Sequence, residues 1–264
     1  MTEACALSSL VSRISSEKQW KFQTPHQRHK GPFKSVAKQP VLPSEKINFR
    51  FRTRLIYATA TKASFDFPNV LHLQICPSII DRMIDRLLDL LLTSWRDRVG
   101  RYFPEWNLPP CLILKMCKKN WDKEFEVEKS TYKALEIIQG TRIPNFYGEL
   151  KYNGKKAILI SDIGGVCLGD PAGAVLEIPD FLDLMKEALT DLGRFHIQPD
   201  DIKLNNFRLV NGRIMVIDFE MVLDKFDTNE DCAREILGLT YWLGRQYEGR
   251  QSCHLADGLI TQVK

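Results

Sequence analysis

The chain has 264 residues, of which 44% are hydrophobic and 27% are charged, a balance that excludes a largely disordered or collagen-like protein. The seven cysteines are odd in number and include no Cys-x-x-Cys pair, which argues against a disulfide framework or a zinc site and favours a reducing compartment. No apolar run approaches the ~20 residues that span a bilayer, and the first residues lack the features of a signal peptide, so we expect a cytoplasmic protein.

The net charge of +4 is distributed unevenly along the chain. Residues 1–54 carry 11 Lys/Arg and 3 Asp/Glu, a net charge of +8, which leaves −4 for the remainder. Residues 1–45 are rich in Ser, Lys, Gln and Pro and show no periodicity, which predicts a disordered basic leader. The basic residues are not interleaved with aromatic ones, so we expect neither a nucleic-acid partner nor a membrane partner.

The first predicted strands follow this leader. From residue 48 to residue 57, apolar side chains alternate with arginines, the period-two pattern of one half-exposed strand. The residues expected on one face are Phe49, Phe51, Leu55 and Tyr57. A second strand is predicted over Val70–Ile75. Residues 58–68 contain no glycine, so a glycine-based phosphate loop of the usual kind cannot form between the two strands.

A long amphipathic helix is predicted over residues 78–100. Ser78 and Asp81 have the spacing of a capping box at its start. One face is apolar and the other is charged. The apolar face comprises Ile80, Ile84, Leu87, Leu88, Leu91 and Trp95, and the charged face comprises Arg82, Asp85, Arg86 and Asp89. We expect the apolar face to pack into the core, with the docking of a partner as the alternative.

A lysine interrupts the next apolar run. Residues 112–116 predict a buried strand, in which the ammonium group of Lys115 requires an anionic partner. The following segment, residues 121–138, has helical spacing, and Glu128 shares the inward side of that helix with Tyr132. We therefore expect Glu128 to pair with Lys115, with Glu124 in reserve. The alternative is an exposed helix with ordinary Glu/Lys pairs.

Two further strands are predicted over Ile143–Leu150 and Ala157–Ile160, joined by a turn at Asn153-Gly154. The residues Ser161-Asp162-Ile163 then lead into two glycines, a pattern that suits a hinge. Exposed backbone amide and carbonyl groups at this hinge could read the edge of an adenine.

Two helices are predicted in the last third of the chain. Residues 179–195 have an apolar face and begin with a proline, whose missing N–H does no harm at a helix start. Residues 231–247 form the second helix. The chain beyond Gly249 is expected to be frayed.

The segment from residue 201 to residue 220 concentrates the polar groups that phosphoryl transfer needs. Asp201, Lys203 and Asn206 come first, a hairpin turn at Asn211-Gly212 follows, and a short apolar strand then ends at Asp218. One acid could serve as a general base, while an amide and a second acid hold a divalent cation. Single motifs of this kind are common, but their joint spacing favours a kinase-type site.

These residues resemble the protein-kinase-like superfamily, most closely the kinase-like proteins of fungi and the aminoglycoside and choline phosphotransferases. The resemblance covers residues 48–250. It implies a bilobal α+β fold, with an N-terminal lobe of antiparallel sheet and helices over residues 46–160 and a short, mainly helical lobe over residues 161–250. Residues 251–264 are then expected to be a flexible tail.

The resemblance also implies a role for each matching residue, with ATP and Mg²⁺ as cofactors. Asp201 would be the catalytic base and Lys203 would contact the γ-phosphate. Asn206 and Asp218 would hold Mg²⁺. Lys115 would contact the α- and β-phosphates and pair with Glu128. Ser161, Asp162 and Ile163 would form the hinge.

The expected function is transfer of the γ-phosphate of ATP to a hydroxyl group of a protein or a small molecule. Three features depart from the family pattern. Only five positions separate His196 from Asp201, against about eight in the family, the glycine-rich loop is absent, and Glu220 replaces a glycine. Two alternatives therefore stay open. One is a pseudokinase that binds nucleotide or acts as a scaffold, and the other is a protein outside the kinase class.

Overall fold

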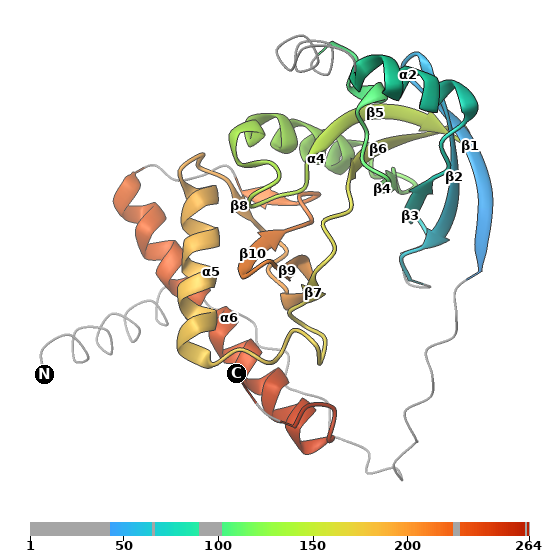
Figure 1. The fold of residues 1–264 in the computed structure, drawn as a ribbon. Helices are drawn as coiled ribbons and strands as arrows, with labels where there is room; N and C mark the ends of the chain where they lie inside the picture. The colour runs from blue at the N-terminus through green and yellow to red at the C-terminus, as the bar shows by residue number, and fades with distance from the viewer. Residues whose placement is uncertain (1–42, 65–66, 90–101, 224–227, 262, 264) are drawn as a thin grey trace, which may run out of the picture. The chain divides into compact units, whose positions relative to one another are not determined.

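The structure is a computed structural model that describes residues 43–64, 67–89, 102–223, 228–261 and 263. It is a mixed α+β fold in which antiparallel sheets are combined with helices (Figure 1). The described elements belong to one compact unit. The predicted leader lies outside the described residues except at its end, where the first strand begins at Ser44, and the predicted division into two lobes stays a prediction.

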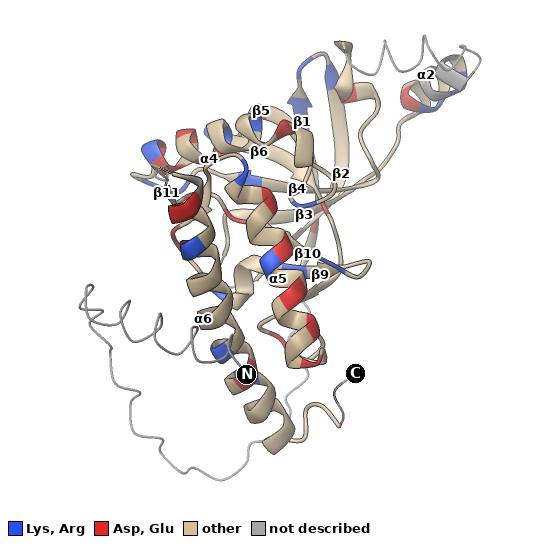
Figure 2. Ribbon diagram, turned by 90° about the vertical axis from the view of Figure 1, so that its left-hand side faces the viewer, with Lys and Arg blue, Asp and Glu red and all other residues tan. Residues whose placement is uncertain are grey.

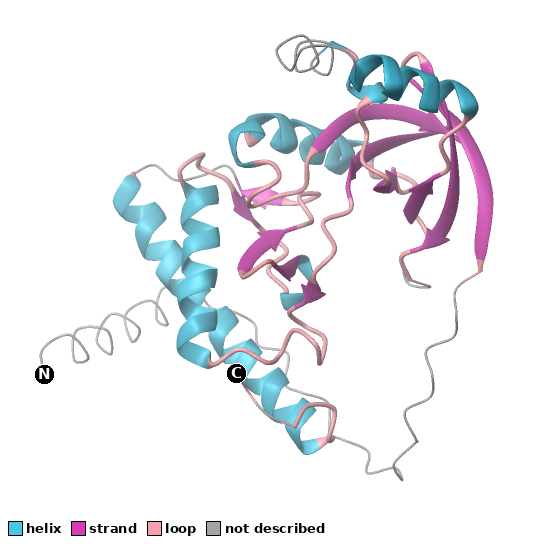
Figure 3. Ribbon diagram, viewed as in Figure 1, coloured by secondary structure: helices cyan, strands magenta, loops and turns pink. Residues whose placement is uncertain are grey.

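A six-stranded sheet occupies the first part of this unit (Figure 3). Its strands lie in the order β1-β2-β3-β4-β6-β5, and each neighbouring pair is antiparallel. Their bounds are Ser44–Phe51 (β1), Arg54–Lys62 (β2), Val70–Ile75 (β3), Cys111–Met116 (β4), Phe146–Tyr152 (β5) and Lys155–Ser161 (β6). One face buries a cluster of aliphatic and aromatic side chains that includes residues from all six strands.

The segment predicted as one strand over residues 48–57 is a hairpin of two strands, so that prediction was wrong. A two-residue turn at Arg52-Thr53 places Phe51 directly opposite Arg54. Opposite residues of a pair share a face, so the turn reverses the parity of the pattern. The buried residues of β2 are consequently Arg54 and Ile56, while Leu55 and Tyr57 are exposed.

The segment between β3 and β4 leaves the sheet and returns to it at one place. The two strands are paired neighbours, and the Ile75 N–H donates to Pro110 O at 2.8 Å. The segment begins with α2 (Ile79–Asp89) and ends with the short 3-10 helix η1 (Pro104–Trp106). The capping box is confirmed, because the Ser78 N–H donates to Asp81 Oδ2 at 2.7 Å and the Asp81 N–H donates to Ser78 Oγ at 3.2 Å.

The expectation that α2 packs its apolar face into the core was wrong for Ile80 and Leu87, while Ile84 is half-buried. Ile79, Ile80, Met83 and Leu87 expose between 61% and 74% of their accessible surface. Asp81 is buried instead, and its Oδ1 lies 3.0 Å from Arg54 Nε. A buried guanidinium needs an anion, so the helix turns Asp81 inward. Residues 90–101, which include Leu91 and Trp95, lie outside the described part.

Removing the charge of Asp81 is expected to destabilise the fold. Asp81→Asn leaves Arg54 buried and uncompensated, which costs about 3–5 kcal/mol of the free energy of unfolding near neutral pH. Urea unfolding measures the loss. Glu248→Gln, which removes an exposed partner of Arg245, is the matched control and should change stability by less than ~0.5 kcal/mol.

The difference in the free energy of unfolding between the wild type and Asp81→Asn should depend on pH. Burial opposes ionisation of Asp81, but hydrogen bonds from the Ser78 backbone and Arg54 outweigh it and hold the pKa of Asp81 below its ordinary 3.8. A lowered folded-state pKa contributes stability that is present above the unfolded pKa and is lost as the pH falls through the folded one. The deficit of Asp81→Asn should therefore narrow below about pH 3.8, and an equal deficit at all pH values would contradict this assignment.

The second part of the unit is mainly helical, with small sheets. Its elements are α4 (Asp122–Ala134), η2 (Glu136–Ile138), β7 (Val166–Cys167), α5 (Ile178–Gly193), β8 (Gln198–Pro199), η3 (Leu204–Asn206), β9 (Phe207–Val210), β10 (Arg213–Val216), β11 (Val222–Leu223) and α6 (Asn229–Ala256). The strands pair antiparallel in the orders β10-β9-β7 and β11-β8. No helix in the described part of the chain is both long and apolar enough to cross a membrane.

Both predicted Asn-Gly turns are confirmed. Asn153 and Gly154 have φ angles of 48° and 76°, and Asn211 and Gly212 have φ angles of 49° and 76°. Positive φ at both central positions is the conformation that type I′ hairpins require. The second turn joins β9 to β10, and it therefore sets the register that carries the chain from Asn206 back to Asp218.

The last helix extends further than predicted, because α6 continues to Ala256 instead of fraying after Gly249. The buried Gln251 side chain explains the extension. Its Nε2 donates to Ala174 O at 3.2 Å and to Leu176 O at 2.9 Å. These bonds satisfy carbonyl groups of the loop before α5, and they fix residues 251–256 of the expected flexible tail as helix.

Tyr247 anchors the same helix to the same loop. Its ring stacks on Phe181 with a centroid distance of 4.0 Å, and its hydroxyl donates to Gly173 O and accepts from the Leu176 N–H. Tyr247→Phe leaves two backbone groups without these partners and is expected to cost about 1–2 kcal/mol in urea unfolding. Tyr241→Phe, at an exposed position of α6, should leave stability unchanged. Equal effects of the two changes would contradict the role of the hydroxyl.

Candidate functional site

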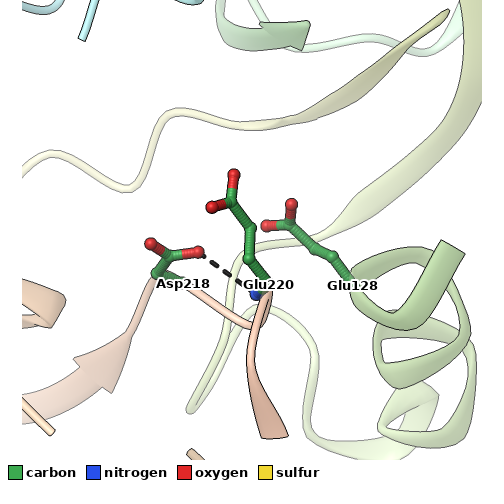
Figure 4. Close-up of side chains that lie close together, drawn as sticks. All are labelled: Glu128, Asp218 and Glu220. Atoms are coloured by element: carbon green, nitrogen blue, oxygen red, sulfur yellow. Dashed lines mark hydrogen bonds between the residues drawn. The ribbon is translucent and has the colours of Figure 1, made fainter. Parts of the chain in front are cut away.

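Lys115 is the centre of a buried cluster of charges. The lysine lies near the end of β4 and exposes 8% of its surface. Its Nζ lies 2.8 Å from Glu128 Oε1, 2.8 Å from Asp218 Oδ1 and 3.1 Å from Glu220 Oε1. Figure 4 shows these three carboxylates gathered in one place. The structure thus brings together three of the predicted site residues, Lys115, Glu128 and Asp218.

Local structure explains how each of these groups reaches the cluster. β4 lies between β3 and β6, so Lys115 is held by strands on both sides. Glu128 occupies the buried side of α4, one turn before the fully buried Tyr132. The predicted pair of Lys115 with Glu128 is therefore confirmed, and the alternative of an exposed helix is excluded at this position. Asp218 follows β10, which the Asn211-Gly212 hairpin places.

Glu220 is the member of the cluster that was not predicted as a site residue. It contacts Lys115, and its Oε2 lies 2.5 Å from Lys118 Nζ. Its backbone N–H donates to Asp218 Oδ1 at 3.3 Å, so a tight turn keeps the two acids together. The signal in the sequence was the position of a second acid two residues after Asp218, on the turn that follows the predicted strand.

The charges of the cluster determine its electrostatics. Burial opposes the ammonium form of Lys115, but Glu128, Asp218 and Glu220 outweigh it and raise the pKa of Lys115. Burial likewise opposes ionisation of Asp218, yet Lys115 outweighs it and lowers the pKa of that carboxyl. Burial raises the pKa of Glu128 to about 7, against the attraction of Lys115.

The cluster has the donor set for a divalent cation. One carboxylate oxygen each from Glu128, Asp218 and Glu220 lie within 4.8 Å of one another. Three carboxylates face the two ammonium groups of Lys115 and Lys118, which leaves an excess of negative charge when all are ionised. Carboxylate oxygens are the ligands that Mg²⁺ takes in proteins, so the residues present fit such an ion.

The predicted catalytic residues Asp201 and Lys203 form a second group with Asn206, one of the two predicted metal ligands. Lys203 Nζ lies 2.8 Å from Asp201 Oδ1, and Asn206 Nδ2 donates to Asp201 O at 2.8 Å. The backbone connects this group to the cluster, because the Ile217 N–H donates to Asn206 O at 3.1 Å. Among the described residues, however, no hydrogen bond or ion pair joins Asp201 or Lys203 to the carboxylates around Lys115.

The predicted hinge residues follow β6 and are held from two sides. Ser161 ends the strand, and its Oγ accepts from the Asn145 N–H. His72 Nδ1 lies 3.0 Å from Asp162 Oδ2, which ties this residue to β3. Ile163 follows with its backbone N–H and C=O outside every hydrogen bond formed by the part of the chain that the structure describes. The backbone groups of Asp162 are likewise outside these hydrogen bonds, so these two residues of the predicted hinge have backbone groups free for a ligand.

Arg208 fixes the glycines after the hinge. Its Nε donates to Gly164 O at 2.7 Å and its Nη2 donates to Gly165 O at 2.8 Å. Gly165 has φ 68°, and a Cβ there would lie 2.4 Å from Leu209 O, so only glycine fits. Both glycine carbonyl groups already accept a hydrogen bond from Arg208. They are therefore less available to accept one from a ligand than their exposure suggests.

Arg142 supports the strand that delivers Asp218. The Val216 N–H donates to Arg142 O at 2.8 Å, and the guanidinium of Arg142 pairs with Glu187 and with Asp191 on α5. Figure 2 shows acidic residues spaced along this helix. The buried arginine therefore connects the end of β10 to α5. This connection helps to hold Asp218, which follows β10, beside Lys115.

A small pocket opens beside the cluster. It encloses about 200 Å³ of space that is open to solvent, and it is lined by Lys115, Met116, Cys117, Lys118, Trp121, Glu124, Phe125, Glu128 and Glu220. Glu124, the reserve partner of Lys115, lies at this pocket. Lys118 and Glu220, which form an ion pair, both line this pocket.

Comparisons with known proteins do not extend the assignment. No protein-family model matches the chain, and no curated protein is significantly similar to it. The resemblance to the protein-kinase-like superfamily therefore stays a prediction, and the chemistry of the site has to be judged from its own geometry.

Tyr132 provides a test of how the cluster is packed. Its ring stacks on Phe146 and meets Phe219 edge-on, yet its buried hydroxyl has no hydrogen-bond partner among the described residues. Removing an unsatisfied buried hydroxyl relieves a desolvation cost of about 1–3 kcal/mol, so Tyr132→Phe should leave stability unchanged or increase it. Urea unfolding beside Tyr247→Phe measures the contrast. A loss of stability would show that a bound water or ligand satisfies this hydroxyl.

Proposed function

We propose that the protein is a kinase-like phosphotransferase with the bilobal fold of that superfamily, which moves the γ-phosphate of ATP to a hydroxyl acceptor. The observation that carries the proposal is the position of Lys115, whose ammonium group lies 2.8 Å from both Glu128 and Asp218. These partners are 13 and 103 residues away in the sequence, and their meeting supports a site shaped for phosphate and metal. The acceptor is a protein or small-molecule hydroxyl, and no nucleic-acid or membrane partner is proposed.

The residues have distinct roles in this proposal. Lys115 would exchange its contact with Asp218 for the α- and β-phosphates, while Glu128 keeps its side chain in place. Asp218 and Asn206 would hold Mg²⁺, which supplies neutralising charge to the phosphates when bound, and Glu220 lies close enough to Asp218 to join them. These groups contribute by positioning and by electrostatic stabilisation.

The remaining roles belong to the acceptor and the base. Asp201 would accept the proton of the acceptor hydroxyl, with its present partner Lys203 turning to the γ-phosphate. The free backbone N–H and C=O groups of Ile163 would read the adenine edge, with Ser161 and Asp162 as the flanking hinge residues.

A pseudokinase is the second candidate, and two observations favour it. Both lysines that line the pocket, Lys115 and Lys118, are already paired with carboxylates, as Lys118 is with Glu220. The five positions between His196 and Asp201 also shorten the approach to the base. A misplacement of only ~1 Å can cost ~10²-fold in rate. In this case the chain would bind nucleotide or act as a scaffold without turnover.

Nucleotide binding and phosphate transfer can be tested separately. ATP at about 100 times its Kd should stabilise the protein by about 2.7 kcal/mol in the presence of Mg²⁺, which a thermal shift detects. Asp218→Asn should abolish the Mg²⁺-dependent part of this shift. Asp201→Asn should keep the shift but lower transfer of radiolabelled γ-phosphate by about 10²–10⁴-fold. Asp257→Asn, at an exposed position after α6, is the control.

Each outcome decides between the candidates. A Mg²⁺-dependent shift without transfer supports the pseudokinase. The absence of any shift with ATP, with or without Mg²⁺, would place the protein outside the kinase class. If both substitutions behave like the wild type, the assignment of Asp201 and Asp218 is wrong.

A further inference from the structure

We propose that the outer face of α2 is a docking surface for an acidic amphipathic helix of a partner protein. This α2 face consists of Ile79, Ile80, Met83 and Leu87 together with the bordering Arg82 and Arg86. The proposal does not depend on phosphotransferase activity.

The orientation of α2 is fixed by its polar side. Asp81 is buried against Arg54, and Arg54 Nη1 also donates to Glu105 O at 2.8 Å. The capping box adds two hydrogen bonds between Ser78 and Asp81. Turning the apolar side inward would break these contacts and leave a buried arginine unpaired, which is strongly unfavourable. The exposure of the α2 face is therefore a consequence of the fold.

The shape of the face suits a helix. Ile79, Met83 and Leu87 follow one another at intervals of four residues, so their side chains form a ridge along α2. Ridges of this kind pack into the grooves between the side chains of a second helix. The flexible side chain of Met83 in the middle of the ridge can adapt to the partner.

The charge of the border selects the partner. Arg82 and Arg86 are exposed, and neither forms an ion pair with a residue whose side chain the structure describes, a set that leaves out Asp85 and Asp89. A partner helix with Glu or Asp beside its apolar stripe would place carboxylates against these arginines, whereas Lys or Arg there would be repelled.

A protein helix fits better than an anionic lipid surface. Helices that lie on membranes are rich in Lys and Arg on their polar face. The sequence of α2 contains two arginines and three aspartates, and one of the aspartates, Asp81, is buried against Arg54. A second copy of the chain is disfavoured as well, because two α2 faces would bring the exposed Arg82 and Arg86 of each copy toward each other.

Fluorescence anisotropy with two synthetic peptides tests the proposal on the full chain. The first is a helical peptide of about 18 residues with leucines at i, i+3, i+4 and i+7 and glutamates on both borders. The second has lysines in place of the glutamates. We expect saturable binding of the acidic peptide, at least ~10-fold tighter than that of the basic one and weaker at high salt.

Variants locate the interaction. The double change Met83→Ser and Leu87→Ser should abolish binding without altering the thermal midpoint, because both side chains are exposed. The double change Arg82→Glu and Arg86→Glu should reverse the preference toward the basic peptide. Leu237→Ser, at an exposed apolar position of α6, is the matched control and should bind like the wild type.

Four results would overturn the proposal. These are the absence of saturable binding, equal binding of the two peptides, and stronger binding to phosphatidylserine vesicles than to the acidic peptide. The fourth is self-association in sedimentation experiments that Leu87→Ser removes, since the α2 face would then be an interface between copies of this chain.

Discussion

The ammonium group of Lys115 imposes the strongest constraint on this structure. A lysine on an inner strand of a sheet can stay charged only when anionic groups surround it. Here they come from a helix that follows β4 and from the turn after β10, so Glu128 and Asp218 must both be in place at once. The sheet, α4 and the β9–β10 hairpin are thereby committed to one arrangement, which places a dense group of charges beside a pocket.

The same requirement explains an otherwise surprising helix. Arg54 is buried because the Arg52-Thr53 turn places it opposite the buried Phe51, on the same face of the sheet. A buried arginine requires an acidic partner. Asp81 supplies that acid, although its helix has an apolar side that would gain from burial. An unpaired buried charge costs several kcal/mol, which opposes the ~1.5–3 kcal/mol of transfer free energy that burial of each aliphatic side chain of α2 would contribute.

Sequence patterns correctly predicted the structural features that depend only on residues close together in the chain. The capping box of α2, the two Asn-Gly turns and the inward position of Glu128 all follow from spacings of four residues or fewer, and the structure confirms them. The turn at Arg52-Thr53 escaped notice because neither residue is a typical turn former and the alternation of apolar residues continues across it.

Long-range contacts could not be predicted in this way. Nothing within α2 reveals that Asp81 has a partner 27 residues earlier, so its apolar face suggested burial. The extension of α6 likewise depends on bonds from Gln251 to a loop more than 70 residues away. For the site, the position of Asp201 relative to the carboxylate cluster depends on how the short loop after His196 folds, which no periodicity encodes.

The segment between β3 and β4 begins and ends at neighbouring positions of the sheet, which has a consequence for how this protein could be altered. Ile75 and Pro110 are already hydrogen-bonded neighbours, so a short turn could replace everything between them. Such an excision would strip the sheet of the acid that neutralises Arg54, and a neutral residue would have to replace the arginine in the same step. The segment between β3 and β4 and the residue Arg54 of β2 therefore depend on each other. Neither can be removed from the protein without a change in the other.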